Sequence, residues 1–171
     1  MDVETIWMNG EYVDWEDATV HVLTHALHYG SGIFEGARAY DTEKGTALFR
    51  WDAHVDRLFE SAKPYDLDIG YSPEELTEAT IELIERNGLE SAYIRPLVYY
   101  GYHSLGVSPK DCPTDVTIAV WPWGAYLGDE ALEHGVKVKV SSWRKHASSQ
   151  IPTNAKTTGL YVNSMLAGEE A

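Results

Sequence analysis

Residues 72–88, SPEELTEATIELIERNG, constrain the fold of this chain most strongly, because helix signals mark both ends of the segment. Ser72 can act as the N-cap, Pro73 suits the first helical position, and Glu75 can complete a capping box. Gly88 is a favourable residue for ending the helix. Apolar residues recur inside the segment at helical spacing, so we expect one buried face made of Leu76, Ala79, Leu83 and Ile84.

Hairpin patterns precede this helix. In TIWMNGEYVDW, residues 5–15, the pair Asn9-Gly10 separates two apolar runs, which is a strong signal for a tight β-hairpin. The segments GIFEGARAY, residues 32–40, and TALFR, residues 46–50, flank a polar turn and predict a second hairpin. The chain is therefore expected to begin as antiparallel sheet.

A second helix and three more strands complete the expected elements. Residues 51–63 repeat apolar positions at helical spacing, with Asp52 available as a cap. Strand patterns return at 91–101, 114–123 and 135–143. Strands followed by helices and then by strands again indicate an α+β fold.

The order of these elements predicts more than one domain. We expect a small α+β domain over 1–123, a connector over 124–134, and the beginning of a second domain over 135–171. One strand, one loop and the start of one helix cannot bury a core of their own. The chain is therefore interpreted as a truncated piece of a longer protein.

The charge of the chain excludes one class of partner. A total of 27 acidic and 13 basic residues gives a net charge of −14, which repels nucleic acid. The acidic residues are dispersed, so we expect them to coat a folded surface, either in a salt-adapted cytosol or in an ordinary acidic protein. No apolar run approaches the ~18 residues of a membrane span and no signal peptide is recognisable, which predicts a soluble, cytoplasmic protein.

Three histidines have the spacing of a metal-binding helix face. His21, His25 and His28 would project together from a helix, but no convincing fourth ligand lies nearby. The single cysteine, Cys112, has no second thiol with which to form a zinc motif. We expect packing or interface roles for these histidines and no metal site.

Tyr93 and Arg95 form the first constellation that could carry chemistry. Strand alternation places them on the same face, which brings a hydroxyl and a guanidinium together. A planar cation beside a phenol is a good receptor for a carboxylate. A solvated arginine on an exposed edge strand is the alternative interpretation.

Lys156 is the second candidate for a chemical role. It lies in IPTNAKTTGLYVN among small uncharged residues, with no carboxylate within ten residues on either side. Burial in such a setting would lower the pKa of the amine, because burial disfavours its charged form. A neutral amine can attack an aldehyde, which makes pyridoxal phosphate chemistry plausible, with Tyr161 available to hydrogen-bond the phenolate oxygen of the cofactor. A solvated loop lysine is the alternative.

These motifs together resemble the branched-chain amino acid aminotransferases, which are pyridoxal phosphate enzymes of fold type IV. The likeness covers nearly the whole chain, in the order IWMNGEYVDWEDATVHVLTHALHYGSGIFEGARAY, FRWDAHVDRLFESAK, SAYIRPLVYYG, WPWGAYLG and VSSWRKHASSQIPTNAKTTGLYVNSMLAGEEA. It implies an α+β fold, with the small N-terminal domain of such an enzyme followed by the truncated start of its larger cofactor domain.

The resemblance also implies roles for individual residues. Lys156 matches the lysine that holds the cofactor covalently, Arg57 the arginine that binds its phosphate, and Tyr161 the tyrosine at its phenolate oxygen. The residues that match the substrate side, as carboxylate receptors or as pocket walls, are Tyr93, Arg95, Phe34, Trp123 and Tyr126. The positions expected to reach the neighbouring subunit's site in a homodimer or larger assembly are Tyr29, Gly106 and Val107. Arg38 also has a counterpart in this family, and we assign no role to it.

The implied reaction transfers the amino group of leucine, isoleucine or valine to 2-oxoglutarate through pyridoxal phosphate. D-amino acid aminotransferases and aminodeoxychorismate lyases share the lysine and the phosphate arginine and are the nearest enzyme alternatives. A non-catalytic assembly module is an alternative of a different class. Members of the family continue for roughly as many residues again, so we expect the 171 residues alone neither to bind the cofactor tightly nor to turn over.

Overall fold

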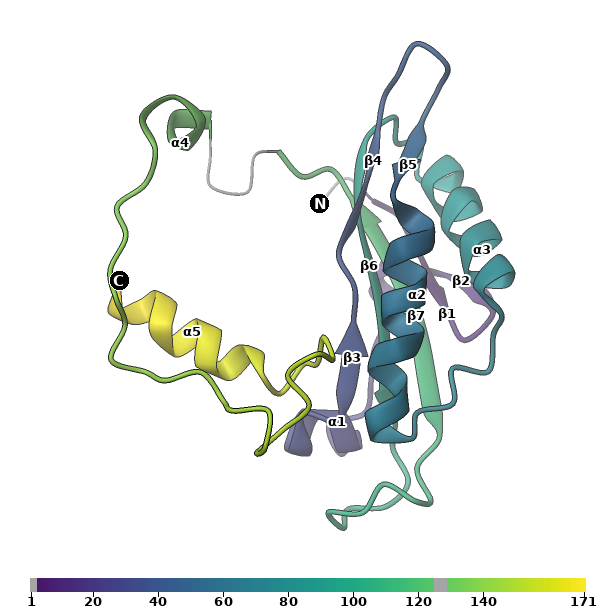
Figure 1. The fold of residues 1–171 in the computed structure, drawn as a ribbon. Coiled ribbons are helices and arrows are strands. Elements are labelled where there is room, and N and C mark those ends of the chain that lie inside the picture. The colour runs from purple at the N-terminus through teal and green to yellow at the C-terminus, as the bar shows by residue number, and fades with distance from the viewer. Residues whose placement is uncertain (1–2, 125–128) are drawn as a thin grey trace.

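An antiparallel sheet forms the centre of the molecule in the computed structural model, which describes residues 3–124 and 129–171 (Figure 1). Within these residues the strand order is β2-β1-β7-β6-β4-β5, and β3 also pairs with β6. The strands are β1 (Thr5–Met8), β2 (Glu11–Asp14), β3 (Gly32–Phe34), β4 (Ala37–Tyr40), β5 (Ala47–Phe49), β6 (Ala92–Tyr100) and β7 (Thr114–Trp121). The predicted α+β class is confirmed.

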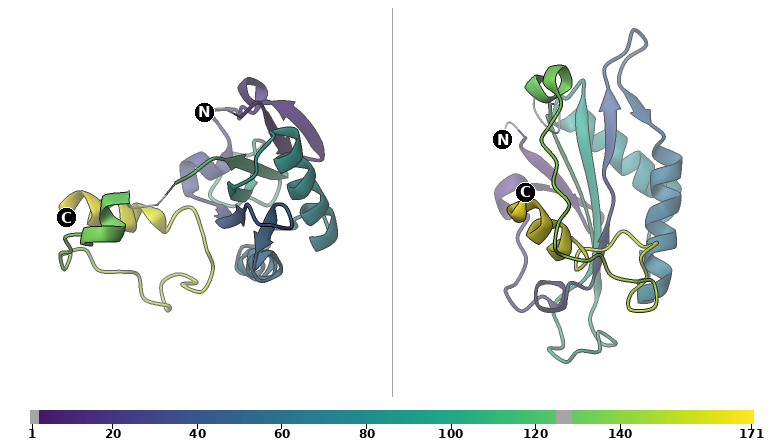
Figure 2. Two further views of the ribbon diagram at one scale, coloured as in Figure 1. Left: turned by 90° about the horizontal axis from the view of Figure 1, so that it is seen from above. Right: turned by 60° about the vertical axis from the view of Figure 1, so that its left-hand side comes forward.

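Two helices cover one face of this sheet, and the C-terminal segment lies on the other side (Figure 2). The covering helices are α2 (Trp51–Ala62) and α3 (Pro73–Arg86). The remaining helical elements are α1 (His25–Tyr29), α4 (Asp129–His134), α5 (Tyr161–Glu170) and the short 3-10 turns η1 (Trp15–Asp17) and η2 (Lys63–Tyr65). None of the helices in the described part of the chain is long and apolar enough to span a membrane.

Side-chain alternation along β6 separates the core from the open face of the sheet. Ile94 and Val98 are fully buried in one cluster with Leu58 of α2 and Leu83 of α3. The intervening side chains of β6 point to the opposite face, because neighbouring residues of a strand alternate. The core therefore fixes β6 from the helix side and leaves Tyr93, Arg95 and Leu97 on the face without α2 and α3.

The two helix predictions have different outcomes. In α3 the Ser72 hydroxyl accepts from the Glu75 amide, the Glu75 carboxylate accepts from the Ser72 amide, and the predicted inner face is buried. Asp52, however, does not cap α2. The chain enters α2 through Arg50 in a left-handed conformation at φ 52°, so the helix begins at Trp51 and Asp52 lies inside its first turn. The buried indole of Trp51 donates to Thr77 Oγ1 and anchors this start.

The first hairpin forms as predicted, with Asn9 and Gly10 at positive φ between β1 and β2, and Asn9 is also bonded to Val116 of β7. The predicted strand 32–40, in contrast, is interrupted between β3 and β4. Phe34 pairs with Leu97 and Ala37 with Ile94, so the register places Glu35 opposite Pro96. Proline has no N–H to donate, which breaks the ladder at that point. The Glu35 amide still donates to the Pro96 carbonyl at 3.0 Å.

The strand predicted over 135–143 is wrong. This segment forms no ladder with any other part of the described chain, and Val138 and Val140 are 88% and 95% exposed. A strand is stable only when a neighbour pairs with its backbone groups. The segment instead contacts the end of α5, where Ser141 and Lys139 hydrogen-bond to Glu170.

Candidate functional site

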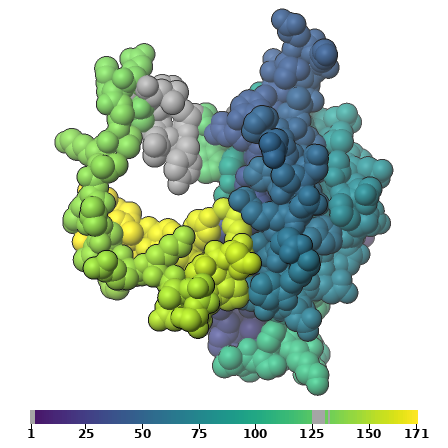
Figure 3. Space-filling model, in the orientation of Figure 1, coloured from purple at the N-terminus to yellow at the C-terminus, as the bar shows by residue number. Residues whose placement is uncertain are grey.

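A segment that we call the lysine segment, residues 153–160, is docked against β3 and α2 (Figure 3). The Lys156 amide donates to Ser61 Oγ of α2 at 3.0 Å, and the Lys156 carbonyl accepts from the Phe34 amide at 3.0 Å. The Thr158 amide donates to the Gly32 carbonyl at 2.9 Å. Both backbone polar groups of Lys156 are therefore bonded to elements of the sheet and its covering helix.

Two glycines approach each other closely at the C-terminal end of the lysine segment. Gly30 has φ +63°, and a Cβ on this residue would lie 2.7 Å from the Cα of Gly159. The Thr158 hydroxyl donates to the Gly30 carbonyl at 2.9 Å. A Cβ fits at Gly30 only if one of the two backbones moves, so this contact requires glycine at position 30, whereas a Cβ at Gly159 would lie 3.2 Å from the Gly30 carbonyl oxygen.

The Lys156 side chain lies among aromatic groups. Its Nζ donates to the Tyr161 hydroxyl at 2.6 Å and is 4.7 Å from the centroid of the Phe34 ring. The rings of Phe34 and Tyr161 are 4.8 Å apart. Lys156 is half-buried, so the burial considered from the sequence is only partial. Lys156 and Tyr161, which the sequence assigned to two groups of the same cofactor, are therefore in direct contact.

Arg57 of α2 is bonded to a carboxylate that lies inside the fold. Its Nε donates to Glu35 Oε1, and its Nη2 donates to Glu35 Oε2 at 2.7 Å. The His54 Nδ1–H donates to Glu35 Oε2 at 2.8 Å, since a carboxylate can only accept. Burial by itself would raise the pKa of Glu35, but the bonds from Arg57 and His54 outweigh it and hold this pKa below its usual range. The bond to Glu35 in turn raises the pKa of Arg57.

Arg57 and Lys156 line the same cavity, of about 260 Å³. Its walls also include Lys145, Thr157, Tyr161 and Asn163, and none of its lining residues is acidic. Within the described part of the chain, the buried Oγ1 of Thr157 has no hydrogen-bond partner. Three cationic side chains and free polar groups suit a ligand that carries a phosphate.

A second cluster lies on the open face of the sheet. Arg95 Nη2 donates to the Tyr93 hydroxyl at 2.9 Å, so the expected placement of both residues on one face is confirmed. The Arg95 guanidinium carbon lies 4.9 Å from the Phe34 ring centroid and 5.7 Å from that of Trp121. Its buried Nε has no partner among the described residues. Phe34 therefore lies between the two clusters, with both the Lys156 amine and the Arg95 guanidinium over its ring.

Comparison with known proteins places the chain in a family. A family model described as amino-transferase class IV matches residues 32–171. The chain belongs to the class IV aminotransferases. It is 54% identical to a branched-chain-amino-acid aminotransferase of Pseudomonas aeruginosa and 53% identical to that of Escherichia coli, in each case over 97% of this chain and 54% of the relative. The chain thus spans about half the length of these curated relatives.

Solved structures give the same result for this class IV aminotransferase chain. The Escherichia coli branched-chain amino acid aminotransferase matches with a TM-score of 0.96 at 52% identity, over 99% of this chain and 56% of that one. The T.th. enzyme, solved with pyridoxamine 5'-phosphate, matches with a TM-score of 0.93 at 49% identity, over 99% and 56%. The resemblance inferred from the sequence motifs is confirmed.

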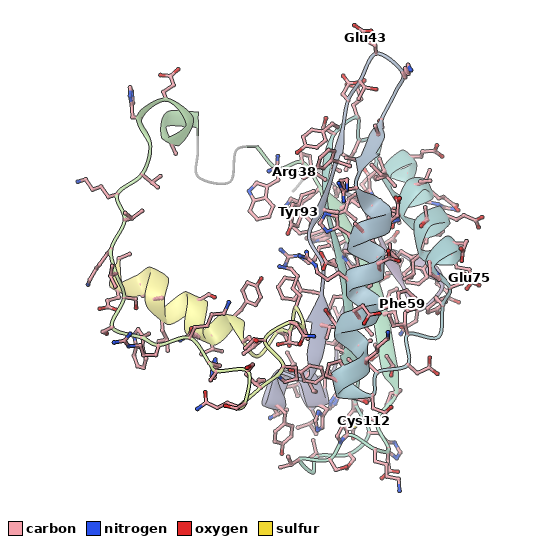
Figure 4. All side chains as sticks on the ribbon, in the orientation of Figure 1. Arg38, Glu43, Phe59, Glu75, Tyr93 and Cys112 are labelled. Carbon is pink, nitrogen blue, oxygen red and sulfur yellow. The ribbon has the colours of Figure 1, made fainter. Side chains whose placement is uncertain are left out.

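Other residues singled out in the sequence of this class IV aminotransferase come from several elements of the fold. Tyr29 of α1 and Val107 are 46% and 78% exposed, and the Tyr29 hydroxyl donates to the carbonyl of Leu105, in the loop that joins β6 and β7. Arg38 pairs with Tyr93 across β4 and β6 (Figure 4), and its Nη2 donates to the Gly124 carbonyl at 2.7 Å. The ring of Trp123 lies 4.5 Å from that of Tyr93. Tyr126 lies outside the described residues.

The three histidines do not lie on one helix. His21 precedes α1, and His25 is buried between Ser31 Oγ at 2.6 Å and the Gly106 carbonyl at 3.0 Å. Of the residues that the structure describes, no group of three or more histidine, cysteine, aspartate or glutamate side chains could hold a metal ion. The packing role expected for the histidines is confirmed for His25.

Sequence reasoning missed three residues that shape the site, namely Glu35, His54 and Ser61. Glu35 has the clearest signal, because it is the only acidic residue within the strand pattern GIFEGARAY. A buried carboxylate requires partners, and residues i and i+3 of a helix lie on one face. The pair His54 and Arg57 in the next helix has that spacing and could have been matched to Glu35.

Proposed function

We propose that this chain provides the lysine-bearing half of a branched-chain amino acid aminotransferase that uses pyridoxal 5'-phosphate. The observation that carries the proposal is the joint presence of the Lys156 amine, the Tyr161 hydroxyl and the Arg57 guanidinium around one cavity without acidic lining residues. This is the donor set required by a ligand with an aldehyde, a phenolate oxygen and a phosphate.

Each cofactor contact is assigned to one side chain. Arg57 would hold the phosphate, Lys156 Nζ would react with the aldehyde, and Tyr161 would donate to the phenolate oxygen. The bound cofactor supplies an electron sink for the amino acid's α-carbon. Thr157 lines the cavity, and its buried Oγ1 has no hydrogen-bond partner among the described residues, which supports the fit because buried hydroxyls normally have a partner.

Lys156 is also the group proposed to move the proton. Its free Nζ would take the proton from the α-carbon of the bound amino acid and would pass it to the carbon that had carried the aldehyde oxygen of the cofactor. The Tyr161 hydroxyl, 2.6 Å away, orients this nitrogen. The backbone bonds of Lys156 to Ser61 and Phe34 keep its Cα in place while the side chain moves.

The aromatic cluster around Arg95 is proposed to bind two kinds of substrate. The related T.th. enzyme has been solved with N-(5'-phosphopyridoxyl)-L-glutamate and with 4-methylvaleric acid, one with an additional carboxylate and one with a branched aliphatic chain. Here Arg95 and Tyr93 would receive the carboxylate of glutamate. Phe34, Trp123 and Tyr126 would form apolar walls for leucine, isoleucine or valine.

We further propose a division into a small domain over 1–123, a connector over 124–134 and the beginning of a cofactor domain over 135–171. The exposed Tyr29 and Val107 are assigned to the neighbouring subunit's site in a homodimer or larger assembly. The hydrogen bond between the Tyr29 hydroxyl and the Leu105 carbonyl supports a joint surface, because it ties α1 to the loop that carries Val107.

The proposal is tested by covalent labelling in the complete polypeptide that carries this sequence. Borohydride reduction in the presence of pyridoxal 5'-phosphate is expected to place the label on Lys156 and to leave Lys156→Ala unlabelled. Lys145→Ala is the matched control, since it removes another cation from the same cavity and should keep the label. A label on another residue in the unaltered protein would refute the proposal.

Substrate profiling separates the branched-chain reaction from its nearest alternatives. Turnover of L-leucine with 2-oxoglutarate is expected, whereas D-alanine should be inert. Preference for D-alanine would favour a D-amino acid aminotransferase, and release of pyruvate from aminodeoxychorismate without an amino acceptor would favour the lyase.

A further inference from the structure

The strongest unassigned feature is the carboxylate of Glu35, which lies beneath the proposed phosphate site. Glu35 is fully buried at the break between β3 and β4, and it faces α2. Its two oxygens accept from Arg57 Nε, Arg57 Nη2, His54 Nδ1 and the Gly36 amide. A buried anion bonded by four donors is held in one orientation.

The bond pattern leaves a defined part of Arg57 available to a ligand. Arginine has five N–H donors, and Glu35 receives one from Nε and one from Nη2. The three remaining donors are on Nη1 and Nη2. The Arg57 side chain is 51% exposed and lines the cavity with Lys156, whereas the Glu35 side chain is 1% exposed. One edge of the guanidinium is therefore fixed inside the fold, and the other makes no hydrogen bond to any residue that the structure describes, which leaves it available to an anion.

We propose that Glu35 is a positioning residue for phosphate binding, which fixes the guanidinium of Arg57 through two hydrogen bonds so that its other edge faces the cavity. His54 completes the arrangement, because it holds Glu35 Oε2 from the preceding turn of α2. The proposal rests on the proposed function, in which Arg57 receives the phosphate of the cofactor.

Two physical effects of Glu35 on an anion have opposite signs. Its negative charge repels a phosphate and would weaken binding. Its hydrogen bonds restrict the arginine, which otherwise loses rotamer freedom when it binds a ligand. We infer that orientation dominates, because the charge of Glu35 is already compensated by direct bonds from Arg57 and His54.

The test compares pyridoxal 5'-phosphate with pyridoxal, which lacks the phosphate, in the complete polypeptide. The amount of reduced adduct at Lys156 is measured by peptide mass mapping over a range of each aldehyde, and the ratio of the two half-saturation concentrations is the phosphate advantage. Glu35→Gln keeps the shape of the side chain and is expected to lower this advantage about tenfold, as loss of a charge-assisted bond would. Reaction with pyridoxal should remain within about twofold of the parent protein, because no phosphate is involved.

Two further variants make the comparison specific. Glu60→Gln on the same helix removes an exposed carboxylate that pairs with Lys63, and it should leave the phosphate advantage unchanged. His54→Ala removes one of the bonds to Glu35 Oε2 and is expected to lower the advantage about threefold. The His54→Ala variant also tests the proposal if the Glu35→Gln protein does not fold.

An unchanged or increased phosphate advantage in both Glu35→Gln and His54→Ala would overturn the proposal, since repulsion would then be the dominant effect. Equal loss with both aldehydes would also overturn it, because Glu35 would then be a structural residue only. A parent protein that reacts with neither aldehyde at Lys156 would refute the proposed function. In that case the role of Glu35 is tested separately, by titrating the protein with inorganic phosphate and following the NMR signal of Arg57 Nε–H. Tenfold weaker phosphate binding by Glu35→Gln supports the positioning role, and equal binding rejects it.

Discussion

Replacing Gly30 by alanine tests whether the glycine contact positions the lysine segment. Gly30 has φ +63°, and its added Cβ would lie 2.7 Å from the Cα of Gly159. Gly88, just after α3, is a matched control, because its φ is +62° and nothing lies within 4 Å of a Cβ there. The two substitutions share the backbone strain and differ only in the steric clash.

The size of each effect follows from this geometry. Alanine in the left-handed conformation costs about 1 kcal/mol relative to glycine, so Gly88→Ala should lose about that much unfolding free energy. A clash with backbone atoms adds about 1–3 kcal/mol at Gly30, for a total of about 2–4 kcal/mol. The hydrogen bonds that hold the lysine segment contribute about 0.5–1.5 kcal/mol each, so lifting the segment off β3 relieves part of this strain.

Amide hydrogen exchange distinguishes local detachment from global loss of stability. In Gly30→Ala we expect at least about tenfold faster exchange at the amides of Phe34 and Thr158, which bond to the Lys156 and Gly32 carbonyls. The amide of Val98 in β6 serves as a reference within the core. If Gly30→Ala equals Gly88→Ala in urea unfolding and also keeps the protection of Phe34 and Thr158, the reasoning is refuted.

Three further predictions concern charge and cofactor. The melting temperature should rise as potassium chloride is increased towards molar concentrations, because salt screens the repulsion of a net charge of −14, and a flat or falling curve in calorimetry would remove the salt-adapted interpretation. The lowered pKa of Glu35 means that its ion pair stabilises the fold above the unfolded pKa of about 4.3 and that this stability is lost as the pH falls through the folded value. The unfolding free energy of the parent protein relative to Glu35→Gln should therefore decline below about pH 5, and a difference independent of pH would contradict the pairing. The 171 residues alone, mixed with pyridoxal 5'-phosphate, should show no stable absorption band; a robust band that is abolished by Lys156→Ala would disprove this expectation.

The features that the sequence predicts well depend on residues close together in the chain. The capping box of α3 joins Ser72 to Glu75, and the turn of the first hairpin is formed by the adjacent residues Asn9 and Gly10 at positive φ. The shared face of Tyr93 and Arg95 follows from the twofold period of a strand. In these cases the interaction that decides the structure is contained within one element or one turn.

The features that the sequence does not predict depend on residues that are far apart in the chain. Glu35 and Arg57 are separated by 22 residues, and Ser61 and Lys156 by 95. The break between β3 and β4 depends on Pro96, which lies in a different strand. Neither local propensity nor periodicity indicates which strand will lie opposite a residue. For the same reason a strand was predicted wrongly over 135–143, where the sequence pattern is typical of a strand but no other strand of the described chain pairs with the segment.

The same dependence on distant partners explains how a lysine on a loop acquires a defined position. Residues 135–152, which lead to the lysine segment, are largely exposed, so they contribute little to the placement of Lys156. Its neighbours Ala155 and Thr157 are instead buried, and its own backbone is bonded to α2 and β3. Phe34 acts twice, because its amide bonds the Lys156 carbonyl and its ring lies beneath Nζ. The sheet and α2, rather than the segment that leads to the lysine, therefore determine where the amine meets its partner groups.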